Sequence, residues 1–236
     1  MGAEIDKNLT KQVFDFLHEE GGDAMGIAPV ERFEDAPQGY HPRDILRSSR
    51  NVVVIGMRQI DSVVDNLPAS RYTFSQHYHI LTRKLDDLAI SLSKFLEQKG
   101  YKSIQIPAEG FYDKKTMHGH LYHDGAAVLA GLGEIGLNNL LLTPKFGPRI
   151  QLVSVVNDAP LEGSPVLGKG LCKEWQKVCN KACITACPAN CISENGFKKE
   201  LCFYYHDKFL SEGLHIYIPK VLCGLCVKAC PRQLPR

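Results

Sequence analysis

The sequence predicts a mixed α/β domain followed by a small cysteine-rich domain, and three observations support this division. Helical and strand periods alternate along the first part of the chain. All nine cysteines lie at or after Cys172. Between these parts, residues 159–170 (APLEGSPVLGKG) lose all periodicity and gather Gly, Pro and Ser. We therefore predict a cofactor- or substrate-binding domain over residues 1–165 and a second domain over residues 166–236.

The first half of the predicted α/β domain contains two helical segments and two strands. A helix is expected over residues 7–20, where apolar residues recur at helical spacing and two glycines follow. A strand over residues 24–28 ends at a proline. Residues 43–46 form a helical turn after another proline, and the β-branched run at residues 51–57 is typical of a buried central strand.

The second half begins with the longest periodic segment of the chain. Residues 74–98 carry leucines every three or four positions and precede a glycine, which predicts one amphipathic helix. A strand is expected at residues 102–106 and a helix at residues 120–129. Residues 137–142 and 150–157 are apolar runs of strand length. Strands interleaved with helices imply a sheet covered by helices.

Composition excludes several classes of partner. The chain has 236 residues, 44% of them hydrophobic, and a formal net charge of only +2. This balance argues against nucleic acid or an acidic membrane as a partner. Apolar runs are shorter than the roughly 20 residues that span a bilayer, and the N-terminus has no secretory signal. We expect a cytoplasmic protein, and the sequence does not indicate its oligomeric state.

The cysteines form two runs of the kind found in bacterial ferredoxins. Residues 179–188 read C-x3-C-x3-C-P and residues 223–231 read C-x2-C-x3-C-P. A C-x3-C-P ending is typical of proteins with two [4Fe-4S] clusters, in which the cysteine before proline binds the other cluster. A disulfide framework fits less well because the cysteine count is odd. Structural zinc suits C-x2-C pairs but does not explain the doubled C-P ending.

The crossover rule divides the cysteines between two [4Fe-4S] clusters. One cluster is predicted to be held by Cys187, Cys202, Cys223 and Cys226. The other is predicted to be held by Cys179, Cys183, Cys230 and, as its fourth ligand, Cys172. Cys191 is the alternative fourth ligand, but it lies just beyond the turn that sends Cys187 to the other cluster.

A glycine loop lies shortly before the predicted boundary. Gly131, Gly133 and Gly136 match G-x-G-x-x-G, the pattern of dinucleotide sites. Only residues 137–143 separate this motif from Pro144, too few for the helix that binds pyrophosphate. The loop is therefore interpreted either as a tight turn or as a place where backbone approaches a flat cofactor.

Several segments resemble a known family. Residues 130–161 (AGLGEIGLNNLLLTPKFGPRIQLVSVVNDAPL), followed by the paired cysteine runs, are similar to the reductase core shared by epoxyqueuosine reductase and the corrinoid-dependent reductive dehalogenases. Residues 23–31, 41–57 and 70–89 also match, in the family's order, so the resemblance covers nearly the whole chain. It implies a nitroreductase-like α/β fold that binds cobalamin and receives electrons from two [4Fe-4S] clusters. Flavin is the second choice of cofactor, because that fold also binds it.

Two departures from the family pattern affect the expected substrate. Met117 stands where epoxyqueuosine reductase has the acid taken as its proton donor, with His118 next and Asp113 four residues earlier. The chain ends at Arg236, soon after the last cysteine, and its basic excess is small. These features predict a minimal relative rather than the tRNA-modifying enzyme itself.

Other polar residues are candidates for the chemistry. The predicted proton donors are His118, His120, His123 and Asp113. The predicted cofactor-binding residues are Gly131, Gly133, Gly136, Tyr78 and His79, of which the last two match a Y-H pair of the family. Arg71 and Arg149 could bind an anionic tail, although a solvated surface role is favoured for each.

These expectations combine into one functional prediction and one alternative. The protein is predicted to be an iron–sulfur oxidoreductase, similar to epoxyqueuosine reductase, that passes electrons through two [4Fe-4S] clusters to cobalamin or a small-molecule substrate. It would need an external low-potential electron donor. The alternative is an electron-transfer module that reduces a partner protein and has no substrate of its own.

Overall fold

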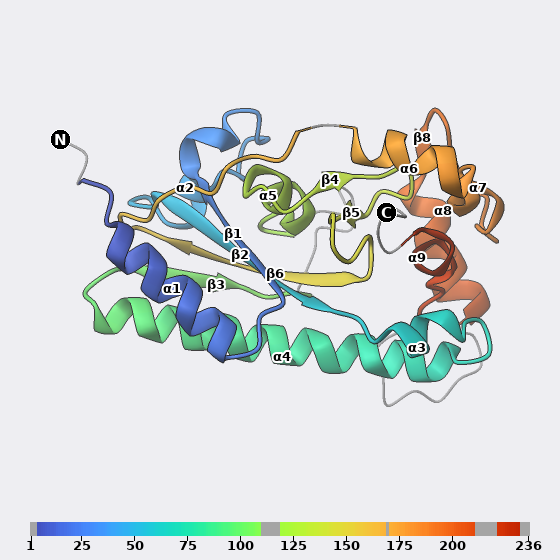
Figure 1. Cartoon of the computed structure of the whole chain (residues 1–236), viewed down its shortest axis with the longest axis horizontal. Helices are drawn as coiled ribbons and strands as arrows, with labels where there is room; N and C mark the ends of the chain where they lie inside the picture. Colours follow the sequence, from blue (N-terminus) through green and yellow to red (C-terminus); the bar gives the residue numbers. More distant parts are fainter. Residues whose placement is uncertain (1–3, 110–118, 169, 211–220, 232–236) are drawn as a thin grey trace. The chain divides into compact units, whose positions relative to one another are not determined.

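The chain folds into two compact units, each made of three segments. The computed structural model describes residues 4–109, 119–168, 170–210 and 221–231 (Figure 1). Unit 1 comprises Met1–Met57, Thr82–Leu132 and Gln151–Leu167. Unit 2 comprises Arg58–Leu81, Gly133–Ile150 and Gly168–Arg236. All nine cysteines belong to unit 2, while the functional division near residue 165 stays a prediction.

Helices and strands alternate through the first two thirds of the chain, and short helices follow. The elements up to the end of the sheet are α1 (Lys7–Glu19), β1 (Ala24–Pro29), η1 (Val30–Phe33), α2 (Pro42–Ile45), β2 (Asn51–Arg58), α3 (Asp61–Asp65), α4 (Arg71–Gln98), β3 (Ser103–Ile106), α5 (His123–Leu129), β4 (Glu134–Ile135), β5 (Leu141–Leu142) and β6 (Ile150–Asn157). The later elements are α6 (Leu171–Cys179), α7 (Ala182–Thr185), β7 (Ile192–Ser193), β8 (Gly196–Phe197), α8 (Lys199–Tyr204), η2 (Tyr205–Leu210) and α9 (Leu225–Ala229).

A four-stranded sheet with the order β1-β2-β6-β3 organises unit 1. β1 pairs antiparallel with β2, and β3 pairs antiparallel with β6. Every residue of β6 is buried, as its largely apolar sequence predicts for an inner strand. The prediction of a mixed α/β fold is therefore confirmed.

The main core lies between one face of this sheet and two helices. The apolar sides of α1 and α4 pack against side chains such as Ile27, Val53 and Val155, and Figure 1 shows both helices on the same side of the strands. Along β1, residues that face this core alternate with residues that face the other side of the sheet. On that other side Gly26 lies so close to Ala130, just beyond α5, that a Cβ on Gly26 would be 2.4 Å from the Ala130 oxygen. Helices thus cover both faces of the sheet within unit 1.

Local boundaries differ from the sequence prediction in three places. α4 begins at Arg71, one turn earlier than expected, and α5 begins at His123, so His120 precedes the helix. Residues 137–142 do not form one strand. Only β5 is extended there, and it pairs with β4 as a hairpin whose turn places Asn139 at φ 57°. The partner strand β4 (Glu134–Ile135) lies within the glycine motif itself.

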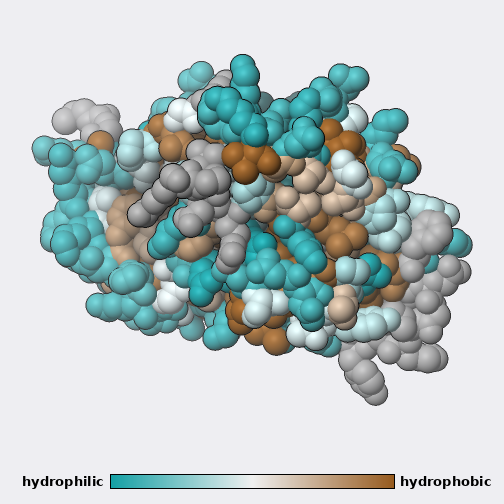
Figure 2. Space-filling model, turned by 45° about the vertical axis from the view of Figure 1, so that its right-hand side comes forward, coloured by the Kyte–Doolittle hydropathy of each residue, from teal (hydrophilic) through white to brown (hydrophobic). Residues whose placement is uncertain are grey.

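The surface of the described part of the chain is mixed in character. Figure 2 shows hydrophilic residues over much of one face, with apolar residues visible between them. Scattered exposed apolar side chains of this kind are normal in folded proteins. Within residues 4–109, 119–168, 170–210 and 221–231, no helix is long and apolar enough to cross a membrane.

Candidate functional site

A first group of cysteines lines one recess in unit 2. Cys172, Cys179, Cys183 and Cys230 border a recess with about 310 Å³ of empty space, part of it open to solvent. The other lining residues are Leu137, Asn138, Leu142, Trp175, Gln176 and Lys181. The fold brings these four thiols together from α6, α7 and the end of α9. They are the four residues predicted to hold one cluster.

The N-terminus of α6 is fixed by a carboxylate from the β4–β5 hairpin. Glu134 Oε2 accepts a hydrogen bond of 2.6 Å from the Gly170 amide, and Glu134 Oε1 accepts one from the Cys172 amide. These amides belong to the first turn of the helix, where N–H groups lack partners inside the helix and a negative charge is favourable. Glu134 therefore positions the backbone of Cys172.

The thiols of this first group interact electrostatically. Burial raises the pKa of Cys183, and repulsion by Cys172 and Cys179 adds to the rise. Burial also raises the pKa of Cys230, again with repulsion by the three other thiols of the group. Mutual repulsion among thiolates is relieved when a cationic metal centre binds between them. The group has the donor chemistry of a metal site.

Unpaired polar atoms lie in the wall of the same recess. Trp175 is 1% exposed and Asn138 is 3% exposed. Among the described residues, Trp175 Nε1 and both side-chain polar atoms of Asn138 have no hydrogen-bond partner. A buried group without a partner costs about 1–3 kcal/mol. Gln176 Nε2 already donates to Cys172 Sγ at 3.7 Å, so an N–H···S contact exists in this wall.

The remaining five cysteines form a second group. Burial raises the pKa of Cys226 to about 12, and repulsion by Cys223, Cys202 and Cys187 contributes. Cys191 contacts a member of this group: its Sγ lies 3.2 Å from Cys187 Sγ, and its amide donates to the same sulfur at 3.4 Å. Although burial acts to raise the pKa of Cys187, these bonds from Cys191 lower it. Cys191 thus behaves as a hydrogen-bonding neighbour of Cys187.

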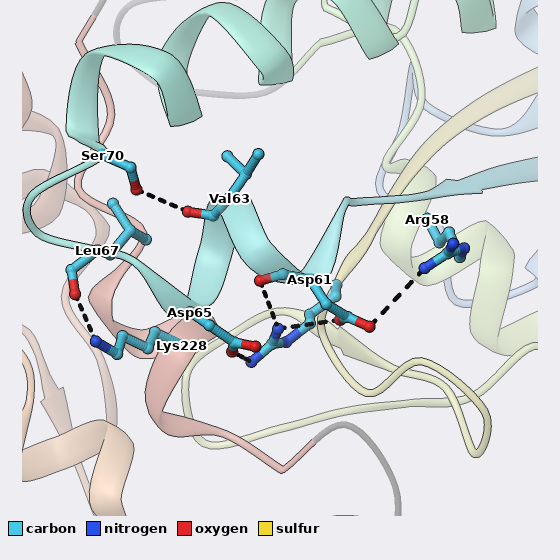
Figure 3. Close-up of polar contacts among 8 residues, drawn as sticks. Arg58, Asp61, Val63, Asp65, Leu67, Ser70 and Lys228 are labelled. Atoms are coloured by element: carbon cyan, nitrogen blue, oxygen red, sulfur yellow. Dashed lines mark hydrogen bonds and ion pairs between the residues drawn. The ribbon is translucent and has the colours of Figure 1, made fainter.

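The start of α4 supports the segment that carries Cys223 and Cys226. Gly224 has φ 67°, and a Cβ there would lie 2.6 Å from the Phe74 ring. Ser75 Oγ accepts a hydrogen bond of 2.8 Å from the Leu222 amide. Figure 3 shows Lys228 bonded to the Leu67 carbonyl oxygen at 2.5 Å. Contacts on both sides of the C-x2-C turn therefore fix its position in unit 2.

Arg149 does not have the surface role that the sequence analysis favoured. Its side chain is 5% exposed, with Nη1 3.0 Å from Asp61 Oδ1 and Nη2 2.6 Å from Asp65 Oδ1. Figure 3 shows Asp61 and Asp65 of α3, with Arg58 a further partner of Asp61. Because Arg149 is buried and paired, it anchors α3 and is not free to bind an anionic tail.

Arg71 lies at the start of α4 in the neighbourhood of the second cysteine group. Burial raises the pKa of Cys223, and the positive charge of Arg71 offsets part of that rise. The guanidinium of Arg71 therefore lies close enough to the Cys223 thiol to interact with it electrostatically.

Among the residues that the structure describes, no group of three or more His, Cys, Asp or Glu side chains could hold a single metal ion. Four thiolates around one zinc ion, at roughly 2.3 Å each, lie roughly 3.8 Å from one another. In a [4Fe-4S] cube each cysteine binds a different iron, so its sulfurs stand farther apart. Thiols are donors for both kinds of centre, and the doubled C-x3-C-P spacing is what favours the cube.

Two of the four candidate proton donors lie within the described residues. Asp113 and His118 lie outside the described residues. His120 is exposed in unit 1, just before α5. His123 bonds at both ring nitrogens, from Nδ1 to Ser154 Oγ at 2.8 Å and from Nε2 to the Pro107 oxygen at 2.9 Å. Because a carbonyl can only accept, Nε2 carries a proton and Nδ1 accepts from the serine in the neutral ring. Burial lowers the pKa of His123, in keeping with that neutral state.

The Y-H pair lies on α4 in unit 2. The rings of Tyr78 and His79 meet edge to face with their centroids 5.7 Å apart, and His79 is buried. The neighbouring His77 accepts a hydrogen bond of 3.0 Å from the Ile60 amide. Whether the pair contacts a cofactor stays a prediction.

The loop glycines are explained by close contacts of the chain with itself. Gly131 has φ 78°, and a Cβ there would lie 2.0 Å from the Pro165 oxygen. A Cβ at Gly133 would lie 2.0 Å from the Leu142 oxygen, and one at Gly136 would lie 2.7 Å from the Leu142 side chain. The close approach that glycine permits is made here by protein backbone and side chains, and whether the loop also contacts a cofactor stays a prediction. Helix α5 before the loop and the hairpin after it also exclude the dinucleotide motif.

Sequence reasoning missed three residues of the cysteine-rich unit. Glu134 was considered only as part of the glycine motif, although an acid there can cap a helix. Asn138 gave no signal. Trp175, the only tryptophan of the chain, lies between Cys172 and Cys179, and that spacing could have suggested a place in the wall of a metal site.

Comparison with known proteins gives relatives of two kinds. No protein-family model matches the chain. Tetrachloroethene reductive dehalogenase of Desulfitobacterium hafniense is 44% identical over 75 residues, which cover 32% of this chain and 13% of the dehalogenase. Epoxyqueuosine reductase of Prochlorococcus marinus is 26% identical over 266 residues, which cover 95% of this chain and 78% of that protein. The chain thus spans only a small part of the dehalogenase but most of the reductase.

Solved structures show the same two kinds of neighbour. A reductive dehalogenase described in connection with B12-dependent dehalogenation superposes with a TM-score of 0.69 and 18% identity, over 87% of this chain and 30% of that one. An epoxyqueuosine reductase bound to an epoxyqueuosine-modified tRNA stem loop superposes with a TM-score of 0.64 and 18% identity, over 97% of this chain and 67% of that one. The fold of the chain is similar to theirs.

Proposed function

Because the chain is related to epoxyqueuosine reductases and reductive dehalogenases, we propose that it is an iron–sulfur oxidoreductase with two [4Fe-4S] clusters. The observation that carries this proposal is the gathering of nine cysteines into two groups. Each group contains the four residues that the ferredoxin-type crossover predicts for one cluster.

The proposed ligands divide according to these groups. One cluster is held by Cys172, Cys179, Cys183 and Cys230, and the other by Cys187, Cys202, Cys223 and Cys226. When bound, the clusters would supply single electrons at low potential. The recess partly shields the first group from solvent, and the contacts from α4 hold the C-x2-C turn of the second group in place.

We further propose that residues 1–165 bind a cofactor or small substrate and that residues 166–236 receive electrons from an external low-potential donor. Cobalamin is the proposed cofactor, because one structural neighbour is described as B12-dependent, and flavin is the second choice. The proposal rests on the relatives and not on Gly131, Gly133 and Gly136, which pack against their own chain. Tyr78 and His79 are the proposed cofactor contacts.

Proton delivery is assigned to residues of the α/β region. His123 is already bonded at both ring nitrogens, so its proposed role is to position the start of α5. His120 is exposed, and with His118 and Asp113 it is the proposed source of the proton that accompanies reduction. One structural neighbour, an epoxyqueuosine reductase, is bound to an epoxyqueuosine-modified tRNA stem loop. RNA is therefore to be tested as a substrate beside small molecules.

The decisive experiment is anaerobic purification and reconstitution of the full chain. We expect about eight iron and about eight sulfide ions per chain, as two [4Fe-4S] clusters require. Folded protein that holds zinc or no iron after reconstitution would refute the proposal. After extraction of the clusters, the visible spectrum should reveal bound cobalamin or flavin. If neither copurifies nor binds when added, the electron-transfer module is the better description.

Incubation with modified tRNA stem loops and with halogenated aromatic compounds, under a chemical reductant, then separates the two substrate classes. Product formation from either one identifies the class. His120→Gln serves as the test of proton delivery, because it should lower turnover while leaving the iron content unchanged.

A further inference from the structure

The recess that holds the first cysteine group contains two hydrogen-bond donors that the proposed function does not yet use. Trp175 and Asn138 both line it, together with Cys172 and the three other thiols of that group. Both side chains are almost completely buried. Among the described residues, neither Trp175 Nε1 nor Asn138 Nδ2 has an acceptor.

Buried N–H groups of folded proteins nearly always have an acceptor, so each exception calls for an explanation. The indole N–H can only donate, and the Asn138 amide offers two further N–H groups. Besides these two residues, the recess is lined by the four thiols, two leucines, Gln176 and Lys181. The Gln176 amide already donates to Cys172 Sγ at 3.7 Å, so sulfur serves as an acceptor for N–H donors in this recess.

We propose that Trp175 and Asn138 donate N–H···S hydrogen bonds at the first cluster site and thereby raise the reduction potential of the cluster held there. The inference rests on the clusters of the proposed function. Reduction adds one electron and increases the negative charge on the sulfurs. A donor aimed at those sulfurs then binds the reduced form more strongly than the oxidised form. Both residues act as positioning and tuning residues and take no part in the chemistry of the substrate.

The test compares reduction potentials of reconstituted full-length variants by titration followed with electron paramagnetic resonance. Trp175→Phe removes the indole N–H and keeps an aromatic ring in the wall, and Asn138→Leu replaces the amide by an apolar group of similar size. Each should lower the ratio of reduced to oxidised cluster at a fixed potential about tenfold, which is about 59 mV for one electron. Only one of the two clusters should shift.

Val178→Ala is the matched control, because Val178 is exposed on the same helix α6. It should leave both potentials unchanged. Trp175→Phe protein that holds about eight iron ions with both potentials unmoved would overturn the proposal. If that variant loses iron, Asn138→Leu decides in the same way, since it leaves the indole in place.

Tryptophan fluorescence gives a second readout that needs no variant. Trp175 is the only tryptophan of the chain, so all indole emission comes from the wall of this recess. Loading the wild-type chain with iron and sulfide should quench that emission strongly, and unchanged emission in the loaded protein would overturn the proposal even if both variants lose iron. Iron-free wild-type protein would instead refute the clusters themselves, so the two failures are distinguishable.

Discussion

The assignment of Cys172 over Cys191 leads to the sharpest prediction. Cys172 shares a recess with Cys179, Cys183 and Cys230, whereas Cys191 contacts Cys187 of the other group at 3.2 Å between sulfurs. Replacing Cys172 by Ser should therefore leave one site with three thiols and the other intact. Because each group of four binds one cube, the iron content should fall from about eight to about four ions per chain.

Cys191→Ser is the control for this experiment. It removes a buried thiol of the same chemistry but leaves both groups of four complete, so about eight iron ions should remain. The bonds from Cys191 to Cys187 lower the pKa of Cys187, so the serine variant should change the spectrum of one cluster only slightly. Iron and sulfide assays with a redox titration measure both variants. Loss of about four irons in Cys191→Ser together with full loading of Cys172→Ser would refute the reasoning.

Three further predictions concern stability. In Gly133→Ala, the new Cβ meets the Leu142 oxygen at 2.0 Å, so thermal unfolding should report a loss of about 1–3 kcal/mol; Gly168→Ala, with open space around it, should show none. Burial lowers the pKa of His123 from 6.5, so the unfolded chain takes up a proton that the native chain does not. The unfolding free energy should be flat above about pH 6.5 and fall below it by up to about 1.4 kcal/mol per pH unit. Denaturant titrations at several pH values should show that the unfolding free energy changes less with pH in His123→Gln than in the wild type. His120→Gln should keep the pH dependence of the wild type. Arg149→Gln should cost about 1–3 kcal/mol, less than a fully buried pair, because both carboxylate partners are partly exposed; an unchanged unfolding midpoint would contradict the anchoring role.

Long periodic segments were predictable, whereas short ones were not. Continuous apolar runs located β2 and β6, and a period of 3.6 residues located α4, each to within a few residues. The β4–β5 hairpin escaped prediction because each strand has only two residues, too few for any period. Two of the elements around the cysteines, α7 and α9, are also short, with four and five residues.

Part of the candidate site was also predictable from spacing. The C-x3-C-P endings divided eight cysteines into the two groups that the structure brings together, although metal binding stays a prediction. Arg149 was misjudged because its partners, Asp61 and Asp65, lie far from it in sequence. Long-range ion pairs leave no local pattern. The same reason hides the role of Glu134, whose bonding partners come more than 30 residues later.

Glu134 links the architecture of the hairpin to that of helix α6. A single carboxylate joins the two, so a substitution that removed this acid would leave the amides of Gly170 and Cys172 without their acceptor. A transplant of the cysteine-bearing segment into another protein would likewise have to include residues 133–150, which contain Glu134. Unit 2 is discontinuous in sequence, so a fragment that begins at residue 166 would lack Glu134 and its bonds to α6.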